Sequence, residues 1–179
     1  MKSCLLVIDL QTGLLAEKPL ADDADAVIGR INSLADRARS EGVPVIYVHH
    51  EESGLEFGSA SWQLDPRVQS RNGDLSIRKT TVDAFYETGL QQLLAKHAIT
   101  HLTICGYATE FCVDTTSRRA ATLGFPVTLV SDAHTTQDRP YLSAQLIRRH
   151  HTDTLVNLSG FPARITAEVA EKLWPNRTK

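Results

Sequence analysis

Residues 102–117 read Leu-Thr-Ile-Cys-Gly-Tyr-Ala-Thr-Glu-Phe-Cys-Val-Asp-Thr-Thr-Ser, and secondary structure is expected to change within them. The short apolar run 102–105 is typical of a buried strand, and Gly106 closes it. Beyond it, apolar residues recur at helical spacing until Gly124, a residue type that commonly follows the last turn of a helix. The stretch therefore predicts a core strand that leads directly into a helix.

A cysteine lies in the first turn of this predicted helix. If Thr109 is the N-cap, Cys112 takes the third helical position, where free N–H groups and the helix dipole favour an anion. That placement lowers the pKa of a thiol and raises its thiolate fraction. Cysteine is also one of the most commonly buried residues, so a structural role stays open unless partners for Cys112 exist elsewhere.

Length, charge and cysteine content limit the classes of protein to consider. The 179 residues suit one domain, residues 1–179, and a net charge of -2 gives no electrostatic reason to expect nucleic acid or an anionic membrane as partner. Three cysteines without Cys-x-x-Cys spacing favour neither a disulfide framework nor a zinc site. We find no signal-peptide pattern and no apolar run of about 18 residues, and we therefore expect a cytoplasmic protein.

Strand and helix patterns alternate along the whole chain. Strands are expected at residues 4–10, 44–48, 102–105, 126–132 and 154–157, with an alternating segment at 75–85. Helices are expected to begin at Asp22 or Asp23, Thr88, Thr109, Asp138 and Ile165. This order predicts an α/β three-layer sandwich, with a mostly parallel sheet of about six strands flanked by helices on both faces.

Two charged residues lie where predicted strands end. Asp9 closes the first apolar run, where a carboxylate is costly to bury unless it is paired, although it could also cap the turn that follows. Lys79 ends an alternating segment, and by itself it would be a surface lysine. Because the carboxyl ends of parallel strands share one edge of a sheet, Asp9 and Lys79 are expected to meet Cys112 there.

Together these three side chains predict acyl transfer through a thioester. A nucleophilic cysteine needs a proton acceptor, and the Asp9 carboxylate would supply it without a histidine. The Lys79 ammonium would keep Asp9 ionised and favour the thiolate of Cys112, while helix N–H groups would form an oxyanion hole. This chemistry requires no cofactor.

The segment His49 to Ser76 has little periodicity and is expected to shape the substrate site or to contact another subunit. His49 and His50 are adjacent and would point to opposite faces of a strand, which argues against a shared metal ion. The segment also contains apolar residues that a lone domain would not readily cover: Phe57, Trp62 and Leu64. We therefore expect a homo-oligomer, either a dimer or a tetramer.

The substrate pocket is expected to be small, partly aromatic and poor in charges. The residues expected around Cys112 are Gln11, His49, Trp62, Tyr107 and Phe111. Such a pocket suits a compact amide or carbamoyl compound that is neutral or weakly anionic, and it would exclude polymers.

Four segments in order resemble the isochorismatase-like cysteine hydrolases. They are Val7-Ile8-Asp9-Leu10-Gln11, Lys79-Thr80-Thr81-Val82-Asp83-Ala84-Phe85, Thr88-Gly89-Leu90 and Cys105-Gly106-Tyr107-Ala108-Thr109-Glu110-Phe111-Cys112-Val113. The resemblance implies a catalytic triad of Asp9, Lys79 and Cys112 and also an oligomer. It further implies a cis peptide between Tyr107 and Ala108 and an oxyanion hole from the N–H groups of Ala108 and Cys112.

Other activities within the family and other classes of protein are the alternatives to amide or carbamoyl hydrolysis. The metal-binding Asp-x-His cluster of the nicotinamidase branch has no counterpart, and the presence of Cys112 favours amide or carbamoyl hydrolysis over cleavage of the vinyl ether of isochorismate. A nucleotide- or flavin-binding module would need a glycine-rich phosphate loop, which is missing. A redox thiol protein would pair Cys112 with Cys105, but a strand should bury Cys105.

Overall fold

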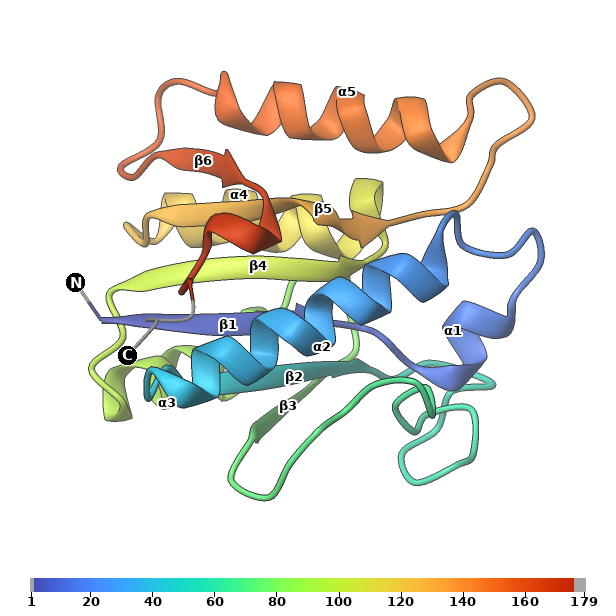
Figure 1. Ribbon diagram of the computed structural model, residues 1–179, viewed down its shortest axis with the longest axis horizontal. Helices are drawn as coiled ribbons and strands as arrows, with labels where there is room; N and C mark the ends of the chain where they lie inside the picture. The colour runs from blue at the N-terminus through green and yellow to red at the C-terminus, as the bar shows by residue number, and fades with distance from the viewer. Residues whose placement is uncertain (1, 176–179) are drawn as a thin grey trace.

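The computed structural model describes residues 2–175, which build one six-stranded sheet in the order β3-β2-β1-β4-β5-β6 (Figure 1). All five strand pairs are parallel. The strands are β1 Ser3–Ile8, β2 Val45–His50, β3 Leu75–Lys79, β4 His101–Tyr107, β5 Val127–Thr135 and β6 Ile165–Glu168. The helices are α1 Thr12–Ala16, α2 Ala24–Ser40, α3 Leu90–Lys96, α4 Asp114–Thr122 and α5 Ala144–Val156, with a π-helical turn η1 Thr109–Val113 and a 3-10 turn η2 Ala170–Lys172.

Two apolar cores lie on the two faces of the sheet. Alternate residues of β1 point to opposite faces, so Leu6 and Ile8 join one core while Leu5 and Val7 join the other. Helix α2 covers the second face, and α3 and α4 cover the first; Figure 1 shows α2 in front of the sheet and α4 behind it. The predicted three-layer α/β sandwich is thus confirmed. The expected single domain spans 1–179, and its ends, residue 1 and residues 176–179, lie outside the described residues.

The strand order places a switch point at the centre of the sheet. From β1 the chain builds outward through β2 to β3, and it then returns to the other side of β1 and builds outward through β4 to β6. In open α/β sheets, ligands bind in the crevice outside the carboxyl ends of the two strands where this direction reverses, here β1 and β4.

The C-terminal third differs from the prediction. Residues 154–157 are expected as a strand, but 154–156 end α5, Asn157 is its C-cap, and Leu155 packs into the core of the sheet. Residues 165–168, expected as the start of a helix, form β6 and pair with Val127–Val130. Pairing with a strand far away in the sequence outweighs the local helical pattern of that segment.

Two helix starts also differ in detail. Ala108, rather than Thr109, precedes the first turn after β4, so Cys112 is the fourth residue of a π-helical turn and not the third of an α-helix. Helix α5 begins after Ser143, whose side chain accepts a hydrogen bond from the Leu146 N–H. Asp138 still caps this helix from the preceding loop, because its Oδ1 accepts a hydrogen bond from the Ala144 N–H at 2.8 Å. Within residues 2–175, no helix combines the length and the apolarity needed to cross a bilayer.

Candidate active site

The carboxyl end of β1 turns sharply at Asp9. Its φ is 52°, in the left-handed region that residues other than glycine rarely adopt, and the side chain is 1 % exposed. The neighbouring strand β4 approaches very closely here, because a Cβ on Gly106 would lie 2.1 Å from the carbonyl oxygen of Ile8. Only glycine fits at that position, and its close approach brings the end of β4 against the turn at Asp9.

Lys79, the last residue of β3, contacts residues that end or follow β2, β1 and β4. Its side chain is buried, and its Nζ lies 2.7 Å from Asp9 Oδ2, 3.3 Å from Cys112 Sγ and 3.0 Å from His50 Nδ1. An ammonium group carries three donors and no acceptor, so these three contacts can use all of them. The structure therefore brings together the three residues predicted as a triad, and it adds His50, which the sequence analysis did not select.

The Cys112 thiol is in an environment opposite to the one expected. Burial raises its pKa to about 12, the Asp9 carboxylate adds to this effect, and the Lys79 ammonium opposes it only in part. A hydrogen bond to Asp9 also raises the pKa of Cys112. The sequence analysis predicted a lowered pKa from the helix position and from the Lys79 charge, whereas here the resting group is a protonated thiol beside a carboxylate that can accept its proton.

His50 is suited to accept a hydrogen bond from Lys79. Burial lowers the pKa of His50, and the nearby Lys79 charge lowers it further, which favours the neutral imidazole. A neutral ring that accepts at Nδ1 carries its proton on Nε2. That nitrogen faces Glu52, with Nε2 3.7 Å from Oε2.

A cavity of about 310 Å³ opens onto Cys112. Its wall includes the apolar or aromatic residues Leu14, Val82, Tyr107 and Phe111 and the polar residues Glu17, His50, Glu52, Gln137 and Arg139. The expectation of few charges is therefore wrong. Three carboxylates, counting Asp9, and one guanidinium line this space.

The predicted substrate contacts divide into two groups. Tyr107 and Phe111 line the cavity, whereas Gln11, His49 and Trp62 do not. The Gln11 side chain donates to the carbonyl oxygens of His50 and Trp62 at 2.9 and 3.0 Å, and the His49 ring stacks on Trp62 with centroids 4.5 Å apart. These three residues thus hold the loop that follows β2 instead of facing a ligand.

The burial of Trp62 also weakens the argument for an oligomer. Trp62 is 9 % exposed, and only Phe57 among the three apolar residues of that argument is largely exposed, at 62 %. The homo-oligomer stays a prediction, and light scattering at micromolar concentration would test it.

Several local interactions fix the turn between β4 and Cys112. The peptide bond between Tyr107 and Ala108 is cis, as the resemblance implied. The Ala108 carbonyl oxygen accepts hydrogen bonds from the N–H groups of Phe111 and Val113, at 3.1 and 3.2 Å. The bond from Val113 to Ala108 spans five residues, as in a π-helix, and Cys112 lies within this turn.

Comparison with known proteins gives the family. Residues 3–156 match the model of the isochorismatase domain. The chain belongs to the isochorismatase family. A crystal structure of an isochorismatase family protein superposes with a TM-score of 0.87 at 36% identity, covering 93% of this chain and 97% of that chain.

Two further proteins are similar to this chain. Streptothricin hydrolase of Streptomyces noursei is 34% identical over 139 residues, which are 76% of this chain and 50% of that protein, so the chain spans about half the length of this curated relative. N-carbamoylsarcosine amidase from Thermoplasma acidophilum has a TM-score of 0.80 at 20% identity, covering 96% of this chain and 98% of that chain. At that identity, the likeness shows the fold alone.

The residues that sequence reasoning missed in this isochorismatase-family site come mainly from loops. Glu17 follows α1, Glu52 follows β2 and Arg139 lies in the loop after β5. No local pattern marks such positions. For His50 a signal existed, because His49 and His50 point to opposite sides of one strand and His50 stands beside Lys79 in the β2–β3 register.

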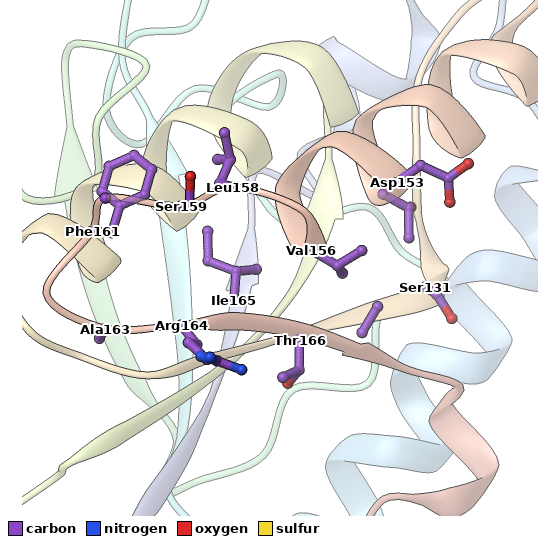
Figure 2. A pocket seen from close by; sticks show the side chains of 13 residues that line it. Ser131, Asp153, Val156, Leu158, Ser159, Phe161, Ala163, Arg164, Ile165 and Thr166 are labelled. Carbon is purple, nitrogen blue, oxygen red and sulfur yellow. The ribbon is translucent and has the colours of Figure 1, made fainter.

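A larger groove elsewhere on the isochorismatase-family domain lacks comparable groups. It lies between α5 and β6 and encloses about 780 Å³ (Figure 2). The residues that line it include Asp153, Phe161 and Arg164 but no cysteine, histidine or lysine. Among residues 2–175, no group of three or more His, Cys, Asp or Glu side chains is placed to hold a metal ion.

Proposed function

We propose that this chain is a cysteine hydrolase that cleaves the C–N bond of an amide or carbamoyl group in a small molecule. The observation that carries the proposal is the position of Lys79 Nζ, 2.7 Å from Asp9 Oδ2 and 3.3 Å from Cys112 Sγ, because both partners line the cavity. One buried cation thus holds a proton acceptor and a nucleophile together. The relationship to streptothricin hydrolase supports hydrolysis as the type of reaction.

The first half of the reaction forms a thioester. As Cys112 Sγ bonds to the substrate carbonyl carbon, the thiol proton moves to the Asp9 carboxylate, so no free thiolate has to exist beforehand. The carbonyl oxygen becomes an oxyanion, which the N–H groups of Ala108 and Cys112 would stabilise. The protonated Asp9 then gives its proton to the leaving nitrogen, the C–N bond breaks and an amine or ammonia departs.

The second half regenerates the enzyme. Water attacks the thioester carbon and loses a proton to Asp9, and collapse of the second oxyanion breaks the C–S bond. The Cys112 thiolate is the leaving group, and it takes the proton back from Asp9. Throughout, the Lys79 ammonium stays beside Asp9 and compensates its negative charge in a site that excludes most water.

A panel of substrates tests the proposed bond type. Small primary amides, ureides and isochorismate are each assayed with and without a chelator, and the protein is examined by mass spectrometry during turnover. We expect hydrolysis of at least one amide or ureide, an acyl adduct on Cys112, and no effect of the chelator. Cleavage of isochorismate without turnover of any amide or ureide would overturn the bond type.

Two other results would contradict the remaining parts of the proposal. Loss of activity caused by the chelator alone would contradict a cofactor-free mechanism. A sulfenic acid or a disulfide on Cys112, found in place of an acyl adduct, would instead indicate a redox thiol protein.

A further inference from the structure

Arg139, the cation that lines the cavity, and the buried Lys79 are both already paired with carboxylates. Lys79 contacts Asp9 at 2.7 Å, and Arg139 donates through Nη2 and Nε to one oxygen of Glu110, at 2.8 and 3.1 Å. Each pair is close to electrically neutral. Neither cation is therefore free to bind an anionic group of a substrate.

Two carboxylates on the cavity wall have no such partner. Glu17 forms no ion pair with any residue in the range 2–175, and Glu52 lies near His50 alone, whose lowered pKa favours the neutral ring. The backbone carbonyl of Glu17 accepts a hydrogen bond from Gln137 Nε2 at 3.1 Å, which fixes the end of α1 at the cavity. The pKa of Tyr107 is raised first by burial and next by the Glu17 charge, so the Glu17 carboxylate acts on the cavity.

The surroundings leave this negative charge uncompensated. Lys18 follows Glu17 in the sequence but is not part of the cavity wall. The wall of the same cavity also includes the apolar residues Leu14 and Val82. Low-dielectric walls around charges of one sign concentrate the field in a cleft and raise the local concentration of oppositely charged ligands.

We propose that Glu17 and Glu52 select substrates that carry a cationic group, such as an ammonium, on the part of the molecule that points out of the cavity. This inference rests on the proposed function, because the cation is placed relative to an acyl group at Cys112. It reverses the neutral or weakly anionic substrate expected from the sequence. For two exposed carboxylates we expect a preference of about fivefold to tenfold over an uncharged isostere.

Labelling of Cys112 measures this preference without turnover. The probes are 2-aminoethyl methanethiosulfonate, a cation, and 2-sulfonatoethyl methanethiosulfonate, an anion, and each rate is divided by the rate of the same reagent with 2-mercaptoethanol. The other two cysteines, Cys4 and Cys105, are fully buried, so peptide mass spectrometry should find the label on Cys112. We expect the cationic reagent to be favoured by about tenfold at low salt, and less at high salt.

Variants assign the effect to the two carboxylates. Glu17→Gln and Glu52→Gln should each reduce the cation-to-anion ratio, and the double variant should bring it close to one. Glu171→Gln is the matched control, because it removes one exposed carboxylate outside the cavity wall and should leave the ratio unchanged. A wild-type ratio of one or less would overturn the inference, and so would an equal loss in Glu171→Gln.

A second comparison links the preference to hydrolysis. β-Alaninamide and butyramide have nearly the same shape, but only the first carries an ammonium, and we expect the higher kcat/KM for β-alaninamide. Equal kcat/KM values would overturn the charge preference while the proposed hydrolysis stands. A cationic labelling preference without turnover of any amide would support the charge selection and overturn the proposed bond type.

Discussion

The cavity at Cys112 and the groove between α5 and β6 differ in their chemical groups more than their volumes indicate. The groove encloses about 780 Å³ and the cavity about 310 Å³, so size alone would favour the groove. Yet only the cavity contains a buried ion pair, Lys79 with Asp9, in contact with a thiol. The groove has single charges at its surface, such as Arg164, and lies beside the amino-terminal half of β5.

This difference shows that the cavity, and not the groove, carries a cost in folding free energy. Burying two charges is expensive even when they pair, and replacing such a pair with apolar residues is often neutral or stabilising. A pair held at the switch point of the sheet, next to a cysteine, is therefore more informative about function than a large open hollow. Three experiments would sharpen or break the comparison.

The largest expected effect is loss of hydrolysis in Cys112→Ala. Removal of the nucleophile should reduce kcat by about 10³-fold or more, since the remaining groups supply only binding and electrostatic stabilisation. The matched variant in the groove, Arg164→Ala, should change kcat less than twofold. Activity is measured on a substrate found in the amide panel, and far-UV circular dichroism checks that both variants fold. Near-normal turnover by Cys112→Ala, or a similar loss in Arg164→Ala, would contradict the assignment of the site.

The next effect concerns stability. Lys79→Met should lower the free energy of unfolding by about 3–5 kcal/mol, because it leaves the Asp9 carboxylate buried without a cation. Arg164→Met in the groove should change it by about 0.5 kcal/mol or less. Urea unfolding at pH 7 measures both values. Combining Lys79→Met with Asp9→Asn should restore part of the loss, and a double variant as unstable as the sum of the singles would show that the two charges do not interact.

Much of the cavity could be anticipated from the sequence because its central residues follow strands. Continuous apolar runs marked the strand before Asp9 and the strand before Cys112, and a parallel sheet brings such ends to one edge. The resemblance to a family added the cis bond before Ala108, which no local pattern indicates. The sequence around Lys79 also did not indicate that its side chain is buried, because the strand alternates like one with an exposed face.

The predictions that were wrong concern features that depend on contacts between residues far apart in the sequence. Residues 165–168 form a strand because they pair with β5, and 154–156 are helical because α5 continues to Val156 and packs Leu155 into the core. The pKa of Cys112 was misjudged because helix position is local, whereas burial and the Asp9 charge come from the tertiary structure. Glu17 and Arg139 reach the cavity from loops, whose positions the sequence does not specify.

The smallest effect tests the charge environment that separates the cavity from the groove. Burial and the Asp9 carboxylate raise the pKa of Cys112 to about 12, so its thiolate fraction at pH 8 is far below that of a free cysteine. Alkylation by iodoacetamide should therefore be slow and should rise with pH, without a plateau below about pH 10. Asp9→Asn removes the second cause of the raised pKa and should speed alkylation at pH 8 by about tenfold, a change of about one pKa unit.

The same variant should hydrolyse amides far more slowly, because an amide side chain cannot take the thiol proton. Faster alkylation together with slower hydrolysis distinguishes a carboxylate that acts as a base from one that only stabilises the fold, since unfolding would expose all three cysteines. Peptide mass spectrometry must therefore find the added label on Cys112 and not on Cys4 or Cys105. Asp153→Asn, which removes a carboxylate from the groove, should change neither rate. A plateau near pH 7 in the wild type, or slower alkylation of Asp9→Asn, would mean that a thiolate is formed in advance and that Asp9 does not raise the pKa of Cys112.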